Sequence, residues 1–102
     1  MALNSYKNET IKVCKQMGWE KISIENLWMF FIEEVGELAS SIRRITTPFA
    51  DKKKPNVESE VMDVLSYLFQ IADKFDIDLD IAWEKWKTHN METTSSFSEE
   101  LQ

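Results

Sequence analysis

Two groups of acidic residues stand out in this sequence, because the members of each recur at the spacing of a helical turn. Glu34 and Glu37 form one pair, with Glu33 directly before them. Glu60 and Asp63 form the other pair. Residues three positions apart lie on the same side of an α-helix, so each pair can point its carboxylates in one direction. Carboxylates with substrate phosphates are typical magnesium ligands, so the pattern predicts a magnesium site built from two helices.

The elements that must position these carboxylates are predicted to be helices, in an all-α fold. Only 2 glycines and 2 prolines occur among 102 residues, and 43% of the residues are hydrophobic, which favours long helices with short connections. Gly18 suits the end of a first helix. Ser23, Asn56 and either Asp78 or Asp80 suit the starts of three more, because short polar side chains cap helix N-termini. The four predicted helices cover approximately residues 4–17, 23–45, 56–75 and 78–89.

The remaining segments are predicted to be a connection and a tail. Residues 46–56 are polar and basic and contain both prolines. From Met91 onward the apolar periodicity is lost, so residues 91–102 are predicted to form a loose C-terminal tail. Residues 1–90 are then predicted to form a single helical domain with one modest core.

The position of the carboxylates on their helices favours metal binding over a solvated surface. At 100° per residue, Glu34 lies inside the apolar stripe of the second helix, with Glu37 at its edge and Glu33 farther out. Glu60 and Asp63 border the apolar face of the third helix. Ionised carboxylates gathered on inward faces are costly unless a cation compensates them. A solvated helix face is an equally good interpretation for Glu33 alone.

Charge and composition argue against several other classes of protein. The net charge of −6 argues against nucleic acid as a partner. Helical di-iron proteins use Glu-x-x-His pairs, and the single histidine, His89, is not spaced in this way from the acidic residues. No signal pattern and no apolar run of membrane-spanning length occurs, so a cytoplasmic protein with no membrane partner is expected.

Trp19 is a candidate for binding a nucleobase. It follows Gly18 in the short connection that leads into the second helix. Its indole ring could stack on a base, or it could pack against the second helix as a hydrophobic staple. Both interpretations stay open at this point.

The order and spacing of residues 33–37 (EEVGE) and residues 60–63 (EVMD) resemble a known signature. It is the EExxE…ExxD motif pair of the MazG-like, all-α nucleoside triphosphate pyrophosphohydrolases. The resemblance extends from about Trp19 through Asn90. It implies that magnesium is bound by a set of four carboxylates, with a fifth in a supporting or water-orienting role. The implied ligands are Glu34, Glu37, Glu60 and Asp63, and the implied catalytic carboxylates are Glu33 and Glu34.

The resemblance also implies a reaction and a mode of assembly. The expected reaction hydrolyses a (deoxy)nucleoside triphosphate to its monophosphate and pyrophosphate, as a house-cleaning activity on the nucleotide pool. The expected assembly is a homo-oligomer, either a dimer or a dimer of dimers, in which paired protomers complete the helical bundle. The alternative function is a non-catalytic helical module for oligomerisation or regulation that keeps the same fold.

The sequence departs from the family pattern near its last predicted helix. Relatives often carry a Lys…Asn-x-x-Arg pattern that contacts the substrate, and only Asn90 fits it here, with Trp86 at the lysine position and Thr93 at the arginine position. Lys85 and Lys87, on either side of Trp86, are therefore the candidate phosphate contacts together with Asn90. The glycine that usually precedes the aspartate after the third helix is Asp76, an exchange expected to affect only the turn.

Overall fold

The computed structural model describes residues 2–47 and 54–101 of the chain, and within these residues the fold is four α-helices with no strand. The predicted all-α fold is confirmed. Most of the predicted basic connection, residues 48–53, lies outside the described residues. The helices are α1 Ala2–Met17, α2 Ile24–Thr46, α3 Val57–Lys74 and α4 Leu79–Leu101.

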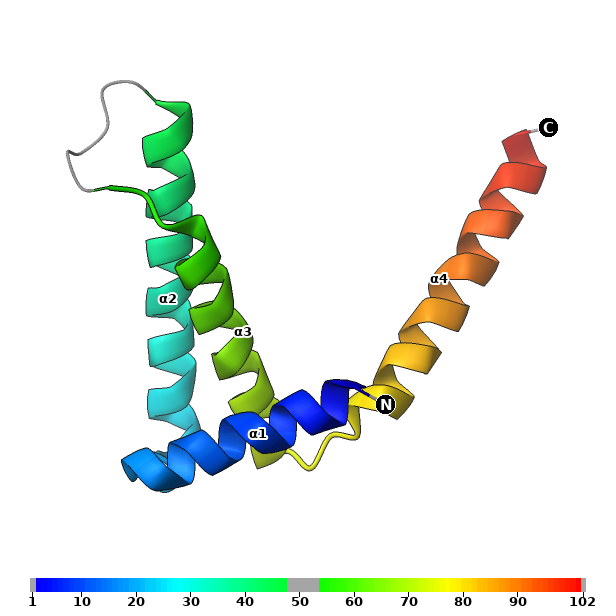
Figure 1. The fold of residues 1–102 in the computed structure, drawn as a ribbon. Helices are drawn as coiled ribbons and strands as arrows, with labels where there is room; N and C mark the ends of the chain where they lie inside the picture. The colour runs from blue at the N-terminus through cyan, green and yellow to red at the C-terminus, as the bar shows by residue number, and fades with distance from the viewer. Residues whose placement is uncertain (1, 48–53, 102) are drawn as a thin grey trace.

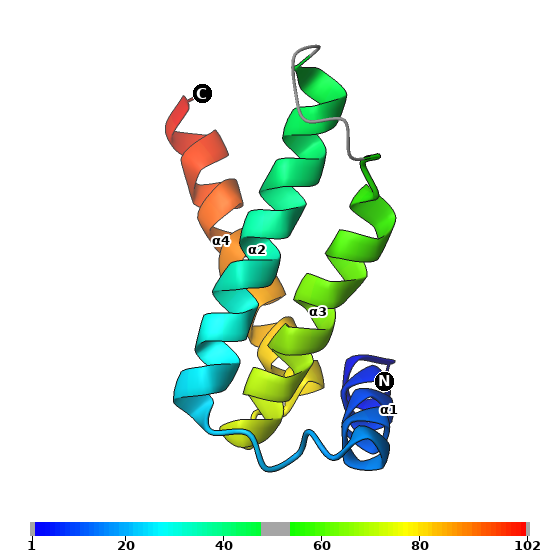
Figure 2. The ribbon, with the colours of Figure 1, turned by 90° about the vertical axis from the view of Figure 1, so that its left-hand side faces the viewer.

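The centre of the structure is the antiparallel pair formed by α2 and α3. These two helices lie side by side, and α1 crosses the end of the pair at which α2 begins and α3 finishes (Figures 1 and 2). Leu27 on α2 is fully buried, and Cys14 on α1 is buried together with Phe69 and Ala72 on α3. Among the described residues these are the buried apolar side chains, so the core of one chain is small.

The predicted N-terminal caps of α2 and α3 are present. The Ser23 hydroxyl oxygen accepts a hydrogen bond from the backbone N–H of Asn26 at 3.2 Å. The Asn56 side-chain oxygen accepts one from the N–H of Ser59 at 3.1 Å. Each cap satisfies an N–H group that has no partner within its helix.

Two helices end in the same way, with a residue in the left-handed conformation. Gly18 has φ 77° after α1, and Asp76 has φ 52° after α3. In each case the next N–H bonds back five residues, from Trp19 to the Cys14 carbonyl and from Ile77 to the Ala72 carbonyl. This is the Schellman arrangement. Aspartate is one of the few residues other than glycine that tolerates it, so the turn forms although the usual glycine is absent.

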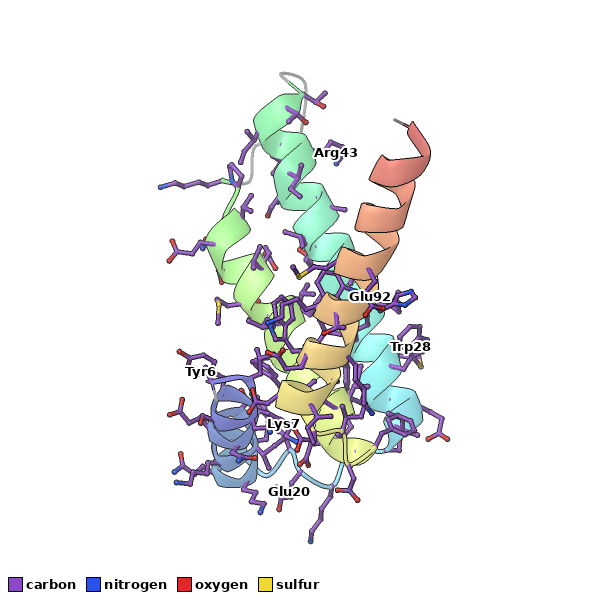
Figure 3. The ribbon with its side chains drawn as sticks, turned by 90° about the vertical axis from the view of Figure 1, so that its right-hand side faces the viewer. Tyr6, Lys7, Glu20, Trp28, Arg43 and Glu92 are labelled. Atoms are coloured by element: carbon purple, nitrogen blue, oxygen red, sulfur yellow. The ribbon has the colours of Figure 1, made fainter. Side chains whose placement is uncertain are left out.

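The start of α4 is held by side chains of α1. The Asn4 amide donates to the Asp78 carboxylate at 2.8 Å and accepts from the Leu79 N–H at 2.9 Å. Lys7 lies where α1 meets the turn before α4 and donates to the Ile77 carbonyl at 2.8 Å (Figure 3). Asp78 also accepts from the N–H of Ile81, so Asp78 is the cap of α4.

The last helix is longer than predicted. The prediction that helix stops near His89 is wrong, because α4 continues to Leu101 through most of the supposed loose tail. No glycine or proline occurs in this stretch to end a helix, and it contains good helix formers such as glutamate. The boundary of the domain at residue 90 stays a prediction.

One chain does not form a compact body. Its α4 packs mainly on α1 and diverges from α2 and α3 (Figure 1). The radius of gyration is 17.7 Å, whereas a compact domain of this length has a value of about 13 Å. None of the described helices combines the length and the apolar character needed to cross a bilayer. The open shape leaves apolar surfaces of α2 and α3 without a neighbour in the chain.

Candidate metal and nucleotide site

Three of the predicted metal ligands meet between α2 and α3. Glu34 on α2, and Glu60 and Asp63 on α3, each offer a carboxylate oxygen, and these oxygens lie within 4.8 Å of one another. We call these three residues the carboxylate cluster. Antiparallel packing places them together because Glu34 lies near the middle of α2, while Glu60 and Asp63 occupy successive turns of α3.

The cluster is electrostatically strained without a cation. Glu34 is half-buried, and burial raises the pKa of its carboxyl above the ordinary value. The negative charges of Asp63 and Glu60 raise this pKa further, followed by those of Glu33 and Glu37. Both effects disfavour the ionised form, which is the form that binds a metal. A bound divalent cation would reverse this balance.

The cluster carboxylates have no competing partner in the described part of the chain. None of the three carboxylate groups forms an ion pair or accepts a hydrogen bond there; the Ser66 hydroxyl donates to the backbone carbonyl of Asp63 and leaves its carboxylate unpaired. Their oxygens are therefore available as ligands, and an all-oxygen donor set of this kind suits magnesium. The residues present fit the metal that the sequence predicted.

Tyr67 extends the site along α3. It lies four residues after Asp63, on the same side of the helix. Burial raises the pKa of its phenol, and the nearby charges of Glu34 and Asp63 raise it further. At neutral pH the hydroxyl therefore stays protonated and can donate a hydrogen bond.

A cavity of about 380 Å³ opens beside Tyr67. We call it the Trp19 cavity. Most of its lining surface is apolar; Trp19, Ile22 and Phe30 line it, and its polar side chains are Lys21, Tyr67 and Gln70. Trp19 is held by the hydrogen bond that closes α1, and its side chain remains half-exposed. A largely apolar hollow with a few polar groups is typical of a site for a small organic molecule.

The other predicted carboxylates flank the cluster. Glu33 is exposed and Glu37 is half-buried, and neither belongs to the group within 4.8 Å. Both lie close enough to Glu34 to raise its pKa. Their roles as catalytic group and as fourth ligand stay predictions.

The predicted phosphate contacts on α4 are not brought to the cluster within one chain, because α4 diverges from α2 and α3. The Lys87 ammonium pairs with the Glu84 carboxylate at 3.1 Å. The Asn90 amide donates to the Trp86 carbonyl at 2.8 Å. Lys85 is exposed.

Sequence reasoning missed two residues of the site, Tyr67 and Gln70. Neither residue was identified from the sequence as part of a site. Both follow Asp63 at helical spacing, four and seven residues later. Extending the face of Glu60 and Asp63 along α3 would have found them.

Comparison with known proteins supports the resemblance read from the motifs. Residues 22–92 match the family model of the MazG nucleotide pyrophosphohydrolase domain. This stretch begins just before α2 and contains the whole carboxylate cluster. Neither curated proteins nor solved structures gave a significant match.

Proposed function

Because the chain belongs to the MazG nucleotide pyrophosphohydrolase family, we propose that it hydrolyses nucleoside triphosphates to monophosphates and pyrophosphate with magnesium. The observation that carries this proposal is the carboxylate cluster, three unpaired oxygen donors within 4.8 Å on facing helices. A non-catalytic helical module would have no need for such a costly arrangement. We assign the activity to house-cleaning of the nucleotide pool.

The residues that hold magnesium are the cluster carboxylates, with Glu37 as an additional ligand one turn after Glu34. When bound, magnesium neutralises phosphate oxygens and supplies positive charge to the developing transition state. The carboxylates fix its position between α2 and α3 and thereby orient the triphosphate along the site.

Glu33 acts as the proton acceptor of this site, and Tyr67 acts as a hydrogen-bond donor. Glu33 lies beside the cluster but outside it, so its carboxylate is free of metal and accepts the proton of the attacking water. The water oxygen attacks phosphorus, the bridge between the α- and β-phosphates breaks, and pyrophosphate leaves. The protonated hydroxyl of Tyr67 donates to a phosphate oxygen. Glu34 would serve catalysis chiefly by holding the metal.

The Trp19 cavity takes the base. It shares Tyr67 with the metal site, so a nucleotide can place its phosphates at the cluster and its base in the cavity. Trp19 provides an aromatic face on which a base can stack. Stacking is tolerant of base identity, so it contributes affinity for nucleotides in general.

The active form is a homo-oligomer built on apolar stripes of α2 and α3. In each stripe an apolar residue recurs every three or four positions, as in a coiled coil. On α3, Leu68 is 46% exposed. On α2, Ile42 is likewise 46% exposed, and Trp28 lies on the side of α2 away from α3 (Figure 3). A second copy offers the same two stripes, which makes a self-complementary interface possible. The α2 stripe is Ile24, Trp28, Phe31, Val35, Leu38, Ile42 and Ile45, and the α3 stripe is Val57, Val61, Val64, Leu68, Ile71 and Phe75.

Such an oligomer also gives the basic residues of α4 a role. One copy keeps α4 apart from its own α2 and α3, so we assign Lys85, Lys87 and Asn90 to substrate contacts made on a neighbouring copy. The positive charges of the two lysines would complement the triphosphate and the acidic cluster that binds it, and the Asn90 amide would add a hydrogen bond.

The proposed function is tested by assaying pyrophosphate release from a panel of ordinary and modified (deoxy)nucleoside triphosphates. The wild-type protein should release pyrophosphate from at least one of them in the presence of magnesium, and none when the metal is chelated. Replacement of Glu60→Gln should abolish most of this release. The matched control, Glu9→Gln, removes an exposed carboxylate on α1 and should leave the rate unchanged. Absence of release from the whole panel would overturn the proposal.

A further inference from the structure

Gln70 is a polar side chain buried in the wall of the Trp19 cavity. It is only 9% exposed, and among the described residues just one other polar side chain, Ser41, is comparably buried. Its neighbours in sequence, Phe69 and Ile71, are apolar. Burying an amide costs free energy unless its hydrogen bonds are made, so this position calls for a physical explanation.

Only part of the hydrogen-bonding capacity of Gln70 is used. Its side-chain nitrogen donates one hydrogen bond to the Ser66 carbonyl at 3.3 Å. The amide carries a second N–H and a carbonyl oxygen, and neither has a partner in the described part of the chain. The carbonyl oxygen is accessible to solvent, and the hollow that Gln70 lines is the Trp19 cavity. A donor and an acceptor are therefore available side by side for a molecule in that cavity.

The position of Gln70 on α3 matches the length of a nucleotide. Glu60, Asp63, Tyr67 and Gln70 succeed one another by three, four and three residues, and so lie on one face of the helix. Gln70 is seven residues beyond Asp63, about 10 Å along the helix axis. The phosphates and the Watson–Crick edge are opposite ends of a nucleotide. With the phosphates at the cluster, that edge points toward the far end of the face, where Gln70 lies.

We propose that Gln70 reads the Watson–Crick edge of the base and determines which base the protein prefers. An amide and a base edge can form two adjacent hydrogen bonds, as glutamine does when it contacts bases in nucleic acids. Trp19 and Phe30 supply the apolar surroundings that strengthen this discrimination, because an unmatched base leaves the amide without partners. This inference rests on the proposed function for the placement of the phosphates.

The test uses nucleosides, which need neither metal nor catalysis. Binding of adenosine, cytidine, guanosine and uridine is measured by NMR titration of the wild-type protein and of Gln70→Met, which keeps volume but removes both hydrogen-bonding groups. The wild type should prefer one nucleoside. Gln70→Met should weaken that one about threefold to tenfold and leave the others nearly unchanged, so that the preference collapses. The matched control is Gln16→Met, the same exchange on the exposed side of α1, and should keep the wild-type preference.

A second measurement does not depend on the folding of the variant. The preferred nucleoside is compared with its analogue methylated on the Watson–Crick ring nitrogen, using the wild-type protein alone. The analogue should bind at least about threefold more weakly. Equal binding of the analogue, equal binding of all four nucleosides, or an unchanged preference in Gln70→Met would each overturn the role of Gln70. If the protein instead shows the predicted binding but releases no pyrophosphate from any triphosphate, the proposed function fails and the base-reading role of Gln70 stands.

Discussion

Removing the charge of Glu34 should stabilise the metal-free protein, although Glu34 is a central residue of the proposed site. The cluster oxygens lie within 4.8 Å of one another, and two unit charges at that separation in water repel by about 0.9 kcal/mol. Glu34→Gln relieves the repulsion with Glu60 and with Asp63. Because Asp63 is exposed, screening reduces the sum, and a gain of about 1 kcal/mol in the free energy of unfolding is expected at low salt.

The assay is thermal unfolding at low ionic strength with a chelator and at one fixed protein concentration, since the melting temperature of an oligomer depends on concentration. A gain of about 1 kcal/mol corresponds to a rise of roughly 4–8 °C for a domain of this size. Glu9→Gln makes the same chemical change at an exposed site on α1 and should shift the free energy of unfolding by less than about 0.5 kcal/mol. Added magnesium should then raise the melting temperature of the wild type, which it binds in the folded form, and have little effect on Glu34→Gln.

The same melts, repeated at lower pH, should change the free energy of unfolding in a definite direction. The pKa of Glu34 is raised in the folded protein, so folding is favoured when this carboxyl is protonated and less so as pH rises through the raised pKa. The metal-free wild type should gain stability relative to Glu34→Gln as pH falls from neutral toward that pKa. If Glu34→Gln melts below the wild type in chelator, or responds to magnesium as strongly, the electrostatic reasoning about the cluster is refuted.

Three further predictions concern the base, the assembly and the start of α4. Trp19→Ala should raise KM more than it lowers kcat in steady-state assays, because stacking binds the substrate and the transition state equally. An unchanged KM with a less cooperative melt would instead identify Trp19 as a hydrophobic staple that packs against α2. Ile42→Lys places a charge in the exposed α2 stripe and should give monomers by light scattering, whereas Met29→Lys, exposed on α2 but outside the stripe, should not; a monomeric wild type contradicts the assembly. Hydrogen bonds from Asn4 and Ile81 lower the pKa of Asp78 below its ordinary value, so the stability of the wild type should fall as pH drops through that lowered pKa. In thermal melts at acid pH, Asp78→Asn should lose less stability than the wild type. An equal dependence of stability on pH in the two proteins would exclude this role of Asp78.

Local patterns were enough to predict most helix ends. Ser23 and Asn56 cap their helices through bonds to residues three positions later, and Gly18 ends α1 with a left-handed conformation. These are short-range effects, so the sequence contains all that determines them. The end of α4 was mistaken because apolar periodicity was used to detect helix, whereas the stretch after His89 continues without an apolar stripe and without a residue that breaks a helix.

The site was predictable only where helical spacing sufficed. Helical spacing indicated that Glu34, Glu60 and Asp63 lie at the inward faces of two helices, and the antiparallel packing of these helices brings the three carboxylates together. The direction of α4 depends on contacts of Asn4 with Asp78 and Leu79, more than 70 residues away in sequence, and no local pattern reports such contacts. The Trp19 cavity could not be predicted for the same reason, because the end of α1, the loop after it, α2 and α3 form it together.

The central claim is that the cluster between α2 and α3 supports hydrolysis between the α- and β-phosphates with magnesium. Phosphorus NMR of the reaction mixture tests it most directly, because this method identifies every phosphate product. With magnesium, the wild-type protein should convert a triphosphate to equal amounts of monophosphate and pyrophosphate, and Asp63→Asn, a variant close in shape, should lose most of this conversion. Formation of diphosphate and inorganic phosphate instead, or an undiminished rate in Asp63→Asn, would contradict the account.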